Sequence, residues 1–308
     1  MKRFLLIVFA LTLVAFTANA QGILSKANWV LVSREEFDTS LADLKTRWTI
    51  ANGPPADSVV NYFTPYADEK NVLIMDGCLY FLTQKLKKPI INPDNRQVYY
   101  YSSGDMQSKF DELPACKSRN DAGYLYGMFE IRCKLPRKAG QYTAYWLHSI
   151  TSPAQEIDVF EQNGRFPDYF FSTVHYGSEA EKREEGDNYY YSANLSDDFH
   201  TWTVVWTPTQ ITWFFDNEEL RTDTIAAHVP GANSPNMVER CSYMKMMHQT
   251  GSGLNYPDKD EVVFEPFVVD YIRIYKPVGY VPYAGYLNPE YDCWYDRIKQ
   301  LYRNTPYM

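Results

Sequence analysis

Alternating apolar and polar positions run through most of the chain and predict β-strands. The alternating segments are short and are separated by turn-forming residues at fairly regular intervals. No long stretch with a helical period of 3.6 residues occurs before residue 277. This pattern predicts an all-β protein built as a sandwich or jelly roll. The clearest segments read YLYGMFEIRCKLP, TAYWLHSI, QEIDVFEQ, DYFFSTVHYG, TWTVVWTP, ITWFFDNEEL and FVVDYIRIY.

The regions between these segments predict turns and loops. In KNVLIMDGCLYFLTQ, the pair Asp76-Gly77 lies between two apolar runs, which indicates a tight hairpin. The charged run SEAEKREEGDN, residues 178–188, predicts a solvated loop. The tail contains WYDRIKQLYRN, for which we expect a short helix packed against the rest of the protein.

The first 20 residues have the order of a cleaved secretory signal. Lys2 and Arg3 precede a short apolar run, which ends in the small-residue sequence ANA before Gln21. No cysteine stands directly after this site, so we expect no lipid attachment, no membrane insertion, and a secreted or periplasmic protein. We divide the chain into a signal peptide (1–20), one β-jelly-roll domain (21–277) and a C-terminal extension (278–308).

Composition narrows the function classes. Aromatic residues make up 16% of the chain, with 26 Tyr and 7 Trp, which suits a carbohydrate-binding cleft or an aromatic core. The net charge of −8 gives no support for nucleic-acid binding. The sequence has no CxxC or HExxH motif, so we expect no metal-dependent hydrolysis. The chain has five cysteines, and this odd number leaves at least one thiol unpaired within a monomer. They are Cys78, Cys116, Cys133, Cys241 and Cys293.

Three carboxylates lie close together in the segment QEIDVFEQ. Glu156 and Asp158 share one face of a strand, whereas Glu161 would point to the other face of a regular strand. A β-bulge at Val159 or Phe160 would turn Glu161 back to the face of the other two. Two carboxylic acids on either side of one bond are the minimum equipment for cleaving a glycoside. The alternative is a solvated sheet face, but the interleaved apolar residues indicate that one face is buried.

With this E-x-D-x-x-E segment, the chain resembles the bulge-containing branch of glycoside hydrolase family 16. The resemblance spans about residues 30–276 and includes REEFD, YSSGDMQSK, YLYGMFEIRCKLP, AYWLHS, STVHYG, FHTWTVVWTPTQITWFFDN and VVDYIRIY. It implies a concanavalin-like jelly roll with an open concave cleft, and endo-acting O-glycosyl hydrolysis with retention of configuration. It matches Glu156 to the nucleophile, Glu161 to the general acid/base, and Asp158 to the carboxylate that orients the nucleophile.

The same resemblance suggests residues that contact the substrate. Trp146 and Tyr142 would stack on sugars, with core packing as the alternative for the tryptophan. His175 would contact the substrate, with a structural histidine as the alternative. His248 and Gln249 stand where relatives carry other polar residues, so contacts there stay open. Cations in turns could meet a sulfate group or could be ordinary surface charge: Arg137, Lys138 and Arg165.

The substrate expectation rests on a short segment. Only nine residues separate Trp146 from Glu156, which is similar to the agarase and porphyranase group and predicts a red-algal galactan. The alternatives are an endo-β-1,3- or mixed-linkage glucanase and a non-catalytic carbohydrate-binding protein. We expect a monomer whose partner is a polysaccharide and whose catalysis needs no cofactor. The resemblance also implies a structural calcium ion near Asp270 and Gly77.

Overall fold

The computed structural model describes most of the chain between residues 23 and 278. The described residues are 23–55, 61–109, 123–149, 155–178, 181–192, 194–207, 210–224, 241–251, 257 and 264–278. The expected signal peptide and C-terminal helix both lie outside them. No helix in these ranges is long and apolar enough to cross a membrane.

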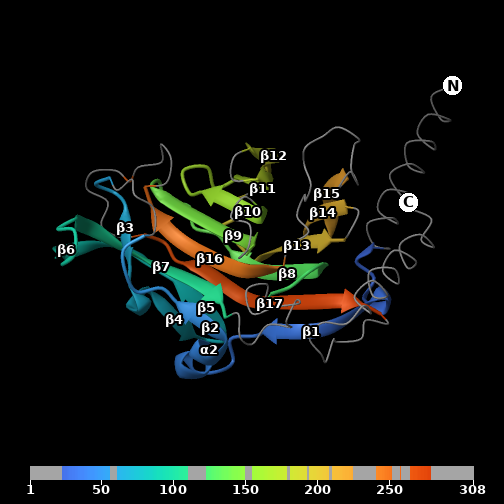
Figure 1. Ribbon diagram of the computed structural model, residues 1–308, viewed down its shortest axis with the longest axis horizontal. Coiled ribbons are helices and arrows are strands. Elements are labelled where there is room, and N and C mark those ends of the chain that lie inside the picture. Colours follow the sequence, from blue (N-terminus) through green and yellow to red (C-terminus); the bar gives the residue numbers. More distant parts are fainter. Residues whose placement is uncertain are drawn as a thin grey trace.

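Two mainly antiparallel sheets form a jelly-roll sandwich (Figure 1), as the alternating pattern predicts. The first sheet has eight strands, with β1 (Trp29–Glu35) pairing to β17 off the main path. Its other strands follow in spatial order: β15 (Glu218–Thr224), β14 (Gln210–Phe215), β13 (His200–Trp206), β8 (Gly127–Lys134), β17 (Phe267–Pro277), β5 (Cys78–Phe81) and β4 (Val72–Met75).

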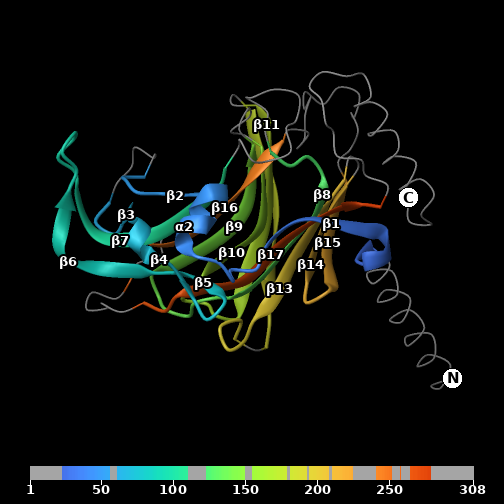
Figure 2. The same cartoon turned by 90° about the horizontal axis from the view of Figure 1, so that it is seen from below.

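The second sheet carries the predicted acidic strand near its middle. β3 (Pro65–Ala67), which runs parallel, and β6 (Thr83–Ile91) both pair with β7, and β6 projects beyond the sandwich (Figure 2). The main path runs through the following strands: β12 (Glu181–Tyr190), β11 (Tyr169–Ser178), β10 (Glu156–Asn163), β9 (Gln141–Ser149), β16 (Ser242–Thr250), β7 (Val98–Ser108) and β2 (Trp48–Ile50).

An aromatic core fills the space between the sheets. Trp202, Trp206 and Trp213 from the first sheet are each 1% exposed, and Phe160 from the second sheet is fully buried. The rings of Phe160 and Trp202 meet with their centroids 4.8 Å apart. Much of the aromatic excess in the composition therefore stabilises the sandwich by burying apolar surface.

The hairpin predicted at Asp76-Gly77 is present between β4 and β5. Both residues have positive φ, +52° and +73°, which a two-residue hairpin turn requires. The loop predicted for residues 178–188 was wrong, because strand β12 occupies most of this range and pairs with β11. Pairing uses backbone groups, and side chains such as Glu184 and Glu185 stay exposed, so charge does not prevent this strand.

The helices are short and lie at the start of the described chain. They are α2 (Leu41–Arg47) and the two 3-10 helices η1 (Lys26–Asn28) and η2 (Glu69–Asn71). The side chain of Ser40 caps α2 by accepting a hydrogen bond from the backbone of Asp43. Cys78 and Cys133 are free thiols, whereas Cys241 is disulfide-bonded.

Candidate active site

Strand β10 contains the predicted β-bulge, and Val159 is its extra residue. Asp158 lies opposite Trp146 of β9, and Phe160 lies opposite the next residue back, Tyr145. On the other side, pairing with β11 is interrupted between Ile157 and Glu161. The pairing register thus confirms the sequence prediction of a bulge at residue 159 or 160.

The bulge brings the three carboxylates to one face of the sheet. Their partners on β9 are His148 for Glu156, Trp146 for Asp158 and Ala144 for Glu161. These three β9 residues are spaced by two, so they share one face, and the carboxylates opposite them share it too. The residues between the acids, Ile157, Val159 and Phe160, are buried in the core. A regular strand would not place all three acids on one face. Burial of these apolar residues on the opposite face stabilises the bulged arrangement that does.

Two histidines surround Glu156. Nδ1 of His148 lies 2.9 Å from Oε2 of Glu156, and Nε2 of His175 lies 4.0 Å from Oε1. Burial raises the pKa of Glu156, but the imidazole of His148 and then that of His175 oppose it, and the net result is a lowered pKa. Glu156 is therefore a carboxylate that stays ionised in a mostly buried position.

Asp158 is the most enclosed of the three acids, with 2% of its surface exposed. Burial raises the pKa of Asp158 well above its usual range, and the charges of Glu161 and Glu156 raise it further. Nε2 of His175 lies 3.1 Å from Oδ2 of Asp158. These effects favour a proton on Asp158 beside an ionised Glu156.

Glu161 has the opposite electrostatic balance from Glu156. Burial raises the pKa of Glu161, and the charge of Glu156 adds to the increase. The hydroxyl of Tyr142 donates a hydrogen bond to Oε1 of Glu161, which lowers the pKa but does not cancel the effect of burial. The site therefore combines one carboxyl group that favours ionisation with another that favours protonation, as acid–base chemistry on a single bond requires.

Two residues around these acids escaped the sequence analysis. His148 lies two positions after Trp146 on the same strand face, and this spacing could have found it. Glu184 lies opposite His175 in β12, and its Oε2 is 3.4 Å from Nδ1 of the imidazole. The charge pattern of residues 178–188 predicts a loop, so no sequence signal places Glu184 beside the site.

The residues expected to bind substrate have different surroundings. Tyr142 and His175 both contact the acids. Trp146 shares their face but is only 8% exposed, and the ammonium of Lys245 lies 4.8 Å from its ring centroid. Lys245 therefore covers part of the ring that would stack on a sugar. Sequence reasoning missed this lysine, which pairs with Trp146 across β16 and β9.

The basic residues of the flanking turns make contacts of their own. Arg137 forms ion pairs with Asp197 at 2.9 Å and with Glu265 at 3.2 Å. Arg165 is exposed in the turn after β10, where the side chain of Asn163 accepts a hydrogen bond from its backbone. The backbone of Lys138 donates to Oε1 of Gln141. Thus Arg137 would have to give up two carboxylates before it could bind a sulfate group.

His248 is a structural residue of the core. It is fully buried, and its Nε2 lies 3.0 Å from the carbonyl oxygen of Glu265. The amide nitrogen of Gln141 also lies 3.0 Å from Nε2, and the hydroxyl of Thr143 lies 3.0 Å from Nδ1, so both ring nitrogens have polar partners in the core. Burial lowers the pKa of His248 to about 3. The neighbouring Gln249 pairs with Tyr142 across the strands and lies on the face of the carboxylates.

The implied calcium site fits the described residues poorly. Asp270 lies next to the Gly77 turn, because its neighbour Val269 pairs with Leu79 of β5. However, Arg132 forms an ion pair with the carboxylate of Asp270. A calcium ion prefers six to eight oxygen ligands, and an adjacent guanidinium competes for the same oxygen. Elsewhere in the described chain, Glu156, Asp158 and His175 have ligand atoms within 4.8 Å of one another, a spacing that could hold a cation.

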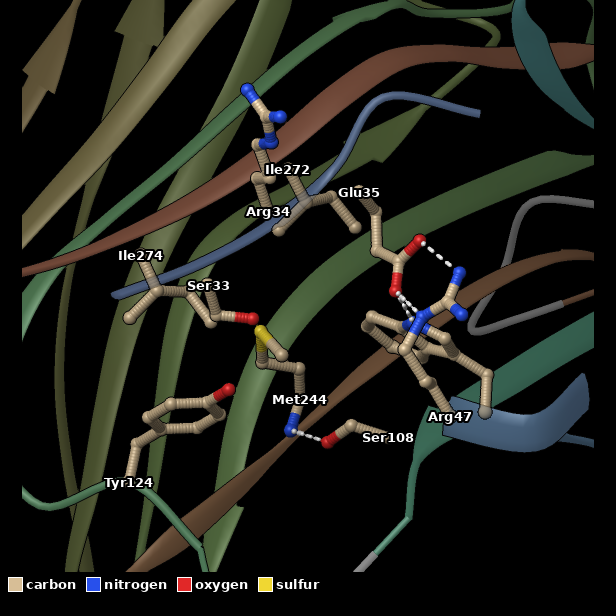
Figure 3. A pocket seen from close by; sticks show the side chains of 10 residues that line it. Ser33, Arg34, Glu35, Arg47, Ser108, Tyr124, Met244, Ile272 and Ile274 are labelled. Atoms are coloured by element: carbon tan, nitrogen blue, oxygen red, sulfur yellow. Dashed lines mark hydrogen bonds and ion pairs between the residues drawn. The ribbon is translucent and has the colours of Figure 1, made fainter. Parts of the chain in front are cut away.

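Figure 3 shows a small pocket whose lining residues come from both sheets and include none of the three acids. It is lined by Glu35, Arg47 and Met244, among others. Tyr243 pairs with His148 on the acidic face, so the next residue, Met244, points to the opposite face and into the core. Glu35 is buried and accepts from Nε and Nη2 of Arg47 at 2.6 and 3.1 Å, and from Nε1 of Trp48 at 3.1 Å. The motif REEFD with Trp48 therefore fastens the first strands to the sandwich.

Comparison with known proteins agrees with this fold. The model of the family described as "Glycosyl hydrolases family 16" matches residues 88–252, more than half of the chain. The glucan endo-1,3-beta-glucosidase A1 of Niallia circulans is 26% identical over 270 residues, which cover 80% of this chain and 38% of that relative. The glucan endo-1,3-beta-glucosidase of Cryptopygus antarcticus is 26% identical over 225 residues, covering 69% and 74%.

A solved structure supports the architecture. The laminarinase catalytic domain of Thermotoga maritima superposes with a TM-score of 0.66 at 24% identity, covering 81% of this chain and 98% of that domain. The chain spans only about two fifths of the Niallia circulans relative, and about three quarters of the Cryptopygus antarcticus relative. Together with the match to the family model, the shared jelly roll and the bulged acidic strand show that this protein belongs to glycosyl hydrolases family 16.

Proposed function

We propose that this protein is an endo-acting retaining β-glycoside hydrolase that cuts a β-glucan with 1,3- or mixed 1,3-1,4-linkages. The observation that carries the chemistry is the bulged strand, which puts Glu156, Asp158 and Glu161 on one face with opposed pKa shifts at the two glutamates. The names of the relatives support the glucan, since they include endo-1,3-beta-glucosidases and endo-1,3-1,4-beta-glycanases.

The reaction follows from the ionisation of the two glutamates. Glu156, ionised beside His148, attacks the anomeric carbon and forms a covalent glycosyl ester as the glycosidic bond breaks. Glu161, protonated, gives its proton to the departing oxygen. A water molecule then loses a proton to Glu161 and cleaves the ester, which restores Glu156 and retains the configuration at the anomeric carbon.

Asp158 and His175 support the nucleophile in this scheme. A neutral Asp158 beside an ionised Glu156 removes one of the two charges that would repel each other across the strand. His175 lies 3.1 Å from Asp158 and 4.0 Å from Glu156, so it can orient both. Burial and the charge of Glu156 together raise the pKa of Glu161, so this pKa falls when the sugar ester neutralises Glu156. Glu161 can then act as the base in the second step.

A red-algal galactan is the second candidate substrate. It rests on the nine-residue segment between Trp146 and Glu156, which is short for a laminarinase. The ion pairs of Arg137 weaken this candidate, because they occupy a cation that could have met a sulfate group.

A substrate panel tests the proposal. Reducing ends released from laminarin, lichenan, agarose and porphyran would be measured for the wild type and for Glu156→Ala. We expect fast release of oligosaccharides from laminarin or lichenan by the wild type only. If only agarose or porphyran were cleaved, the substrate would be a galactan and not a glucan. If the protein bound these polysaccharides but cleaved none of them, it would instead be a carbohydrate-binding protein.

Export is a separate proposal that rests on the first 20 residues. We propose that the leader is removed after Ala20 and that the mature protein starts at Gln21. N-terminal sequencing of the protein recovered from the periplasm or the medium tests this. An uncleaved or lipid-modified N-terminus would contradict it.

A further inference from the structure

Trp213 is a large core residue whose side chain bonds to the backbone of the acidic strand. It lies on β14, in the sheet opposite the carboxylates, and is 1% exposed. Its indole Nε1 donates a hydrogen bond of 2.9 Å to the carbonyl oxygen of Asp158. This bond joins the two sheets at the residue that precedes the bulge.

The bulge creates a need for such a donor. Pairing stops between Ile157 and Glu161 on the β11 side and between Asp158 and Phe160 on the β9 side. Backbone groups inside a bulge lose regular ladder partners, and a buried carbonyl without a donor is strongly unfavourable. The indole of Trp213 satisfies the Asp158 carbonyl from the core side. A regular strand, with its ladder intact, would have no such need.

Trp213 is itself fixed in place by Arg221. The guanidinium of Arg221 lies 4.1 Å from the ring centroid of Trp213. Its Nη1 donates to the carbonyl of Ser172 on β11 at 3.2 Å, and its Nη2 pairs with Asp223 at 2.8 Å. Arg221 thus connects β15, β14 and β11 around the indole. The donor that meets the bulge therefore has little freedom to move.

We propose that Trp213 is a positioning residue, which holds the bulge in the form that turns Glu161 to the face of Glu156 and Asp158. The physical reason is that a slip of one residue sends every following side chain to the other face of the sheet. If the bulge relaxed, Glu161 and the residues after it would move relative to Glu156. The expected effect of Trp213 on the reaction rate rests on the proposed function. Its expected effect on the position of Glu161 does not.

The chain offers two matched controls. Trp202 and Trp206 are also 1% exposed in the first sheet, and Nε1 of each has no hydrogen-bond partner among the described residues. Trp202 packs against Phe160 beneath the bulge, whereas Trp206 packs against Tyr126 and Phe129. Replacing each tryptophan by phenylalanine removes the same volume from the core. Only the replacement of Trp213 removes a hydrogen bond to the acidic strand.

Trp213→Phe, Trp202→Phe and Trp206→Phe would be compared for kcat, KM and thermal stability. We expect Trp213→Phe to lower kcat on the glucan at least about tenfold, with KM nearly unchanged, because losing a buried bond distorts the acids rather than the binding surface. The two controls should lose stability to a similar degree but keep kcat within about threefold. Equal kcat losses in all three variants would overturn the proposal.

A second measurement does not depend on activity. The pKa of Glu161 would be followed by NMR of selectively labelled protein, since the groups that face it come from several strands: Tyr142, Glu156, Asp158, His175 and Glu184. We expect the pKa of Glu161 to shift from its wild-type value in Trp213→Phe, because the burial of Glu161 and its distance from Glu156 change, and to keep the wild-type value in both controls. If the wild type cuts no polysaccharide, the proposed function fails, but this titration still decides the role of Trp213.

A shape-preserving variant covers the case in which Trp213→Phe does not fold. Site-specific incorporation of a benzothienyl analogue at position 213 replaces the indole N–H by sulfur and keeps the ring size. We expect the folded analogue to reproduce both the loss of kcat and the shifted pKa of Glu161. An analogue with the kcat and the Glu161 pKa of the wild type would show that the hydrogen bond has no positioning role.

Discussion

Nδ1 of His148 lies 2.9 Å from Oε2 of Glu156, on adjacent strands that pair these two residues directly. The imidazole is the largest of the effects that oppose the burial of this carboxylate and keep its pKa low. A glutamate in so enclosed a position would otherwise hold its proton. His148 thus makes an ionised nucleophile compatible with burial.

The first prediction concerns this pair. His148→Gln should raise the pKa of Glu156, because it removes the group that favours the charged form. The acidic limb of kcat/KM against pH should therefore move to higher pH, while activity at the alkaline side of the optimum falls much less. Steady-state rates between pH 4 and pH 9 would show the shift. An acidic limb at the wild-type position would mean that His148 does not govern Glu156.

The second prediction separates the two glutamates. Glu156→Ala should abolish the glycosyl-enzyme, and added azide should at most restore slow cleavage with inverted configuration. Glu161→Ala should lose far less rate on an aryl glycoside than on a polysaccharide, because a good leaving group needs no proton. Azide should then accelerate the second step and give a product of retained configuration.

NMR of the azide products distinguishes the two outcomes. If Glu161→Ala gave the inverted product, the roles of the two residues would be reversed. If both variants kept full activity, the bulged strand would not be the active site.

The third prediction concerns Tyr142, whose hydroxyl donates to Glu161 and lowers its pKa. Tyr142→Phe removes a hydrogen bond to the charged form, so the pKa of Glu161 should rise further. The alkaline limb of kcat/KM should move to higher pH, and kcat at neutral pH should change by about three- to tenfold. Tyr169→Phe is a suitable control, because the Tyr169 hydroxyl donates to Asn188 rather than to an acid of the site. An alkaline limb that moves to lower pH would contradict the prediction.

The fourth prediction is a pH dependence of stability that comes from His248. Its pKa is about 3 in the folded protein, below the value of about 6.5 for an unfolded chain. The unfolded chain therefore binds the proton first, so the stabilising effect of a neutral His248 is complete above pH 6.5. It is lost as the pH falls toward 3, by at most about 1.4 kcal/mol for each pH unit.

Urea unfolding of the wild type and of His248→Gln at several pH values tests this dependence. The variant should be less stable at pH 7.5 but should lose less stability than the wild type between pH 6.5 and pH 4. Acidic residues contribute equally to both proteins, so the difference between the two curves isolates His248. Parallel curves would show that His248 is not neutral and buried in solution.

Sequence alone predicted the features that local spacing determines. The bulge followed from the parity of Glu156 and Glu161 around an apolar segment, and the Asp76-Gly77 hairpin followed from its turn residues. The role of Trp213 as a bulge donor could not be foreseen, because it joins strands 55 positions apart. The partners of Arg137 were equally hidden, since Glu265 lies 128 positions away.

Strand β12 shows why a charge pattern can mislead. Hydrophobic alternation reports which side chains are buried, and a strand at the end of a sheet with both faces exposed buries few of them. The segment around Glu184 therefore carries no apolar signal, although its backbone pairs with β11 along ten residues. Propensity reasoning treats such a run as a loop, and only the neighbouring strand reveals its structure.

The carboxylates of β12 have a further consequence for the protein at high concentration. A terminal strand presents unsatisfied backbone groups to which the same strand of another copy could add. Glu184, Glu185 and Asp187 are exposed along β12, and charged side chains on a terminal strand disfavour the addition of another strand. These acidic residues thus discourage aggregation through the end of the sheet as the described strands define it, and they lie beside the strand that carries His175.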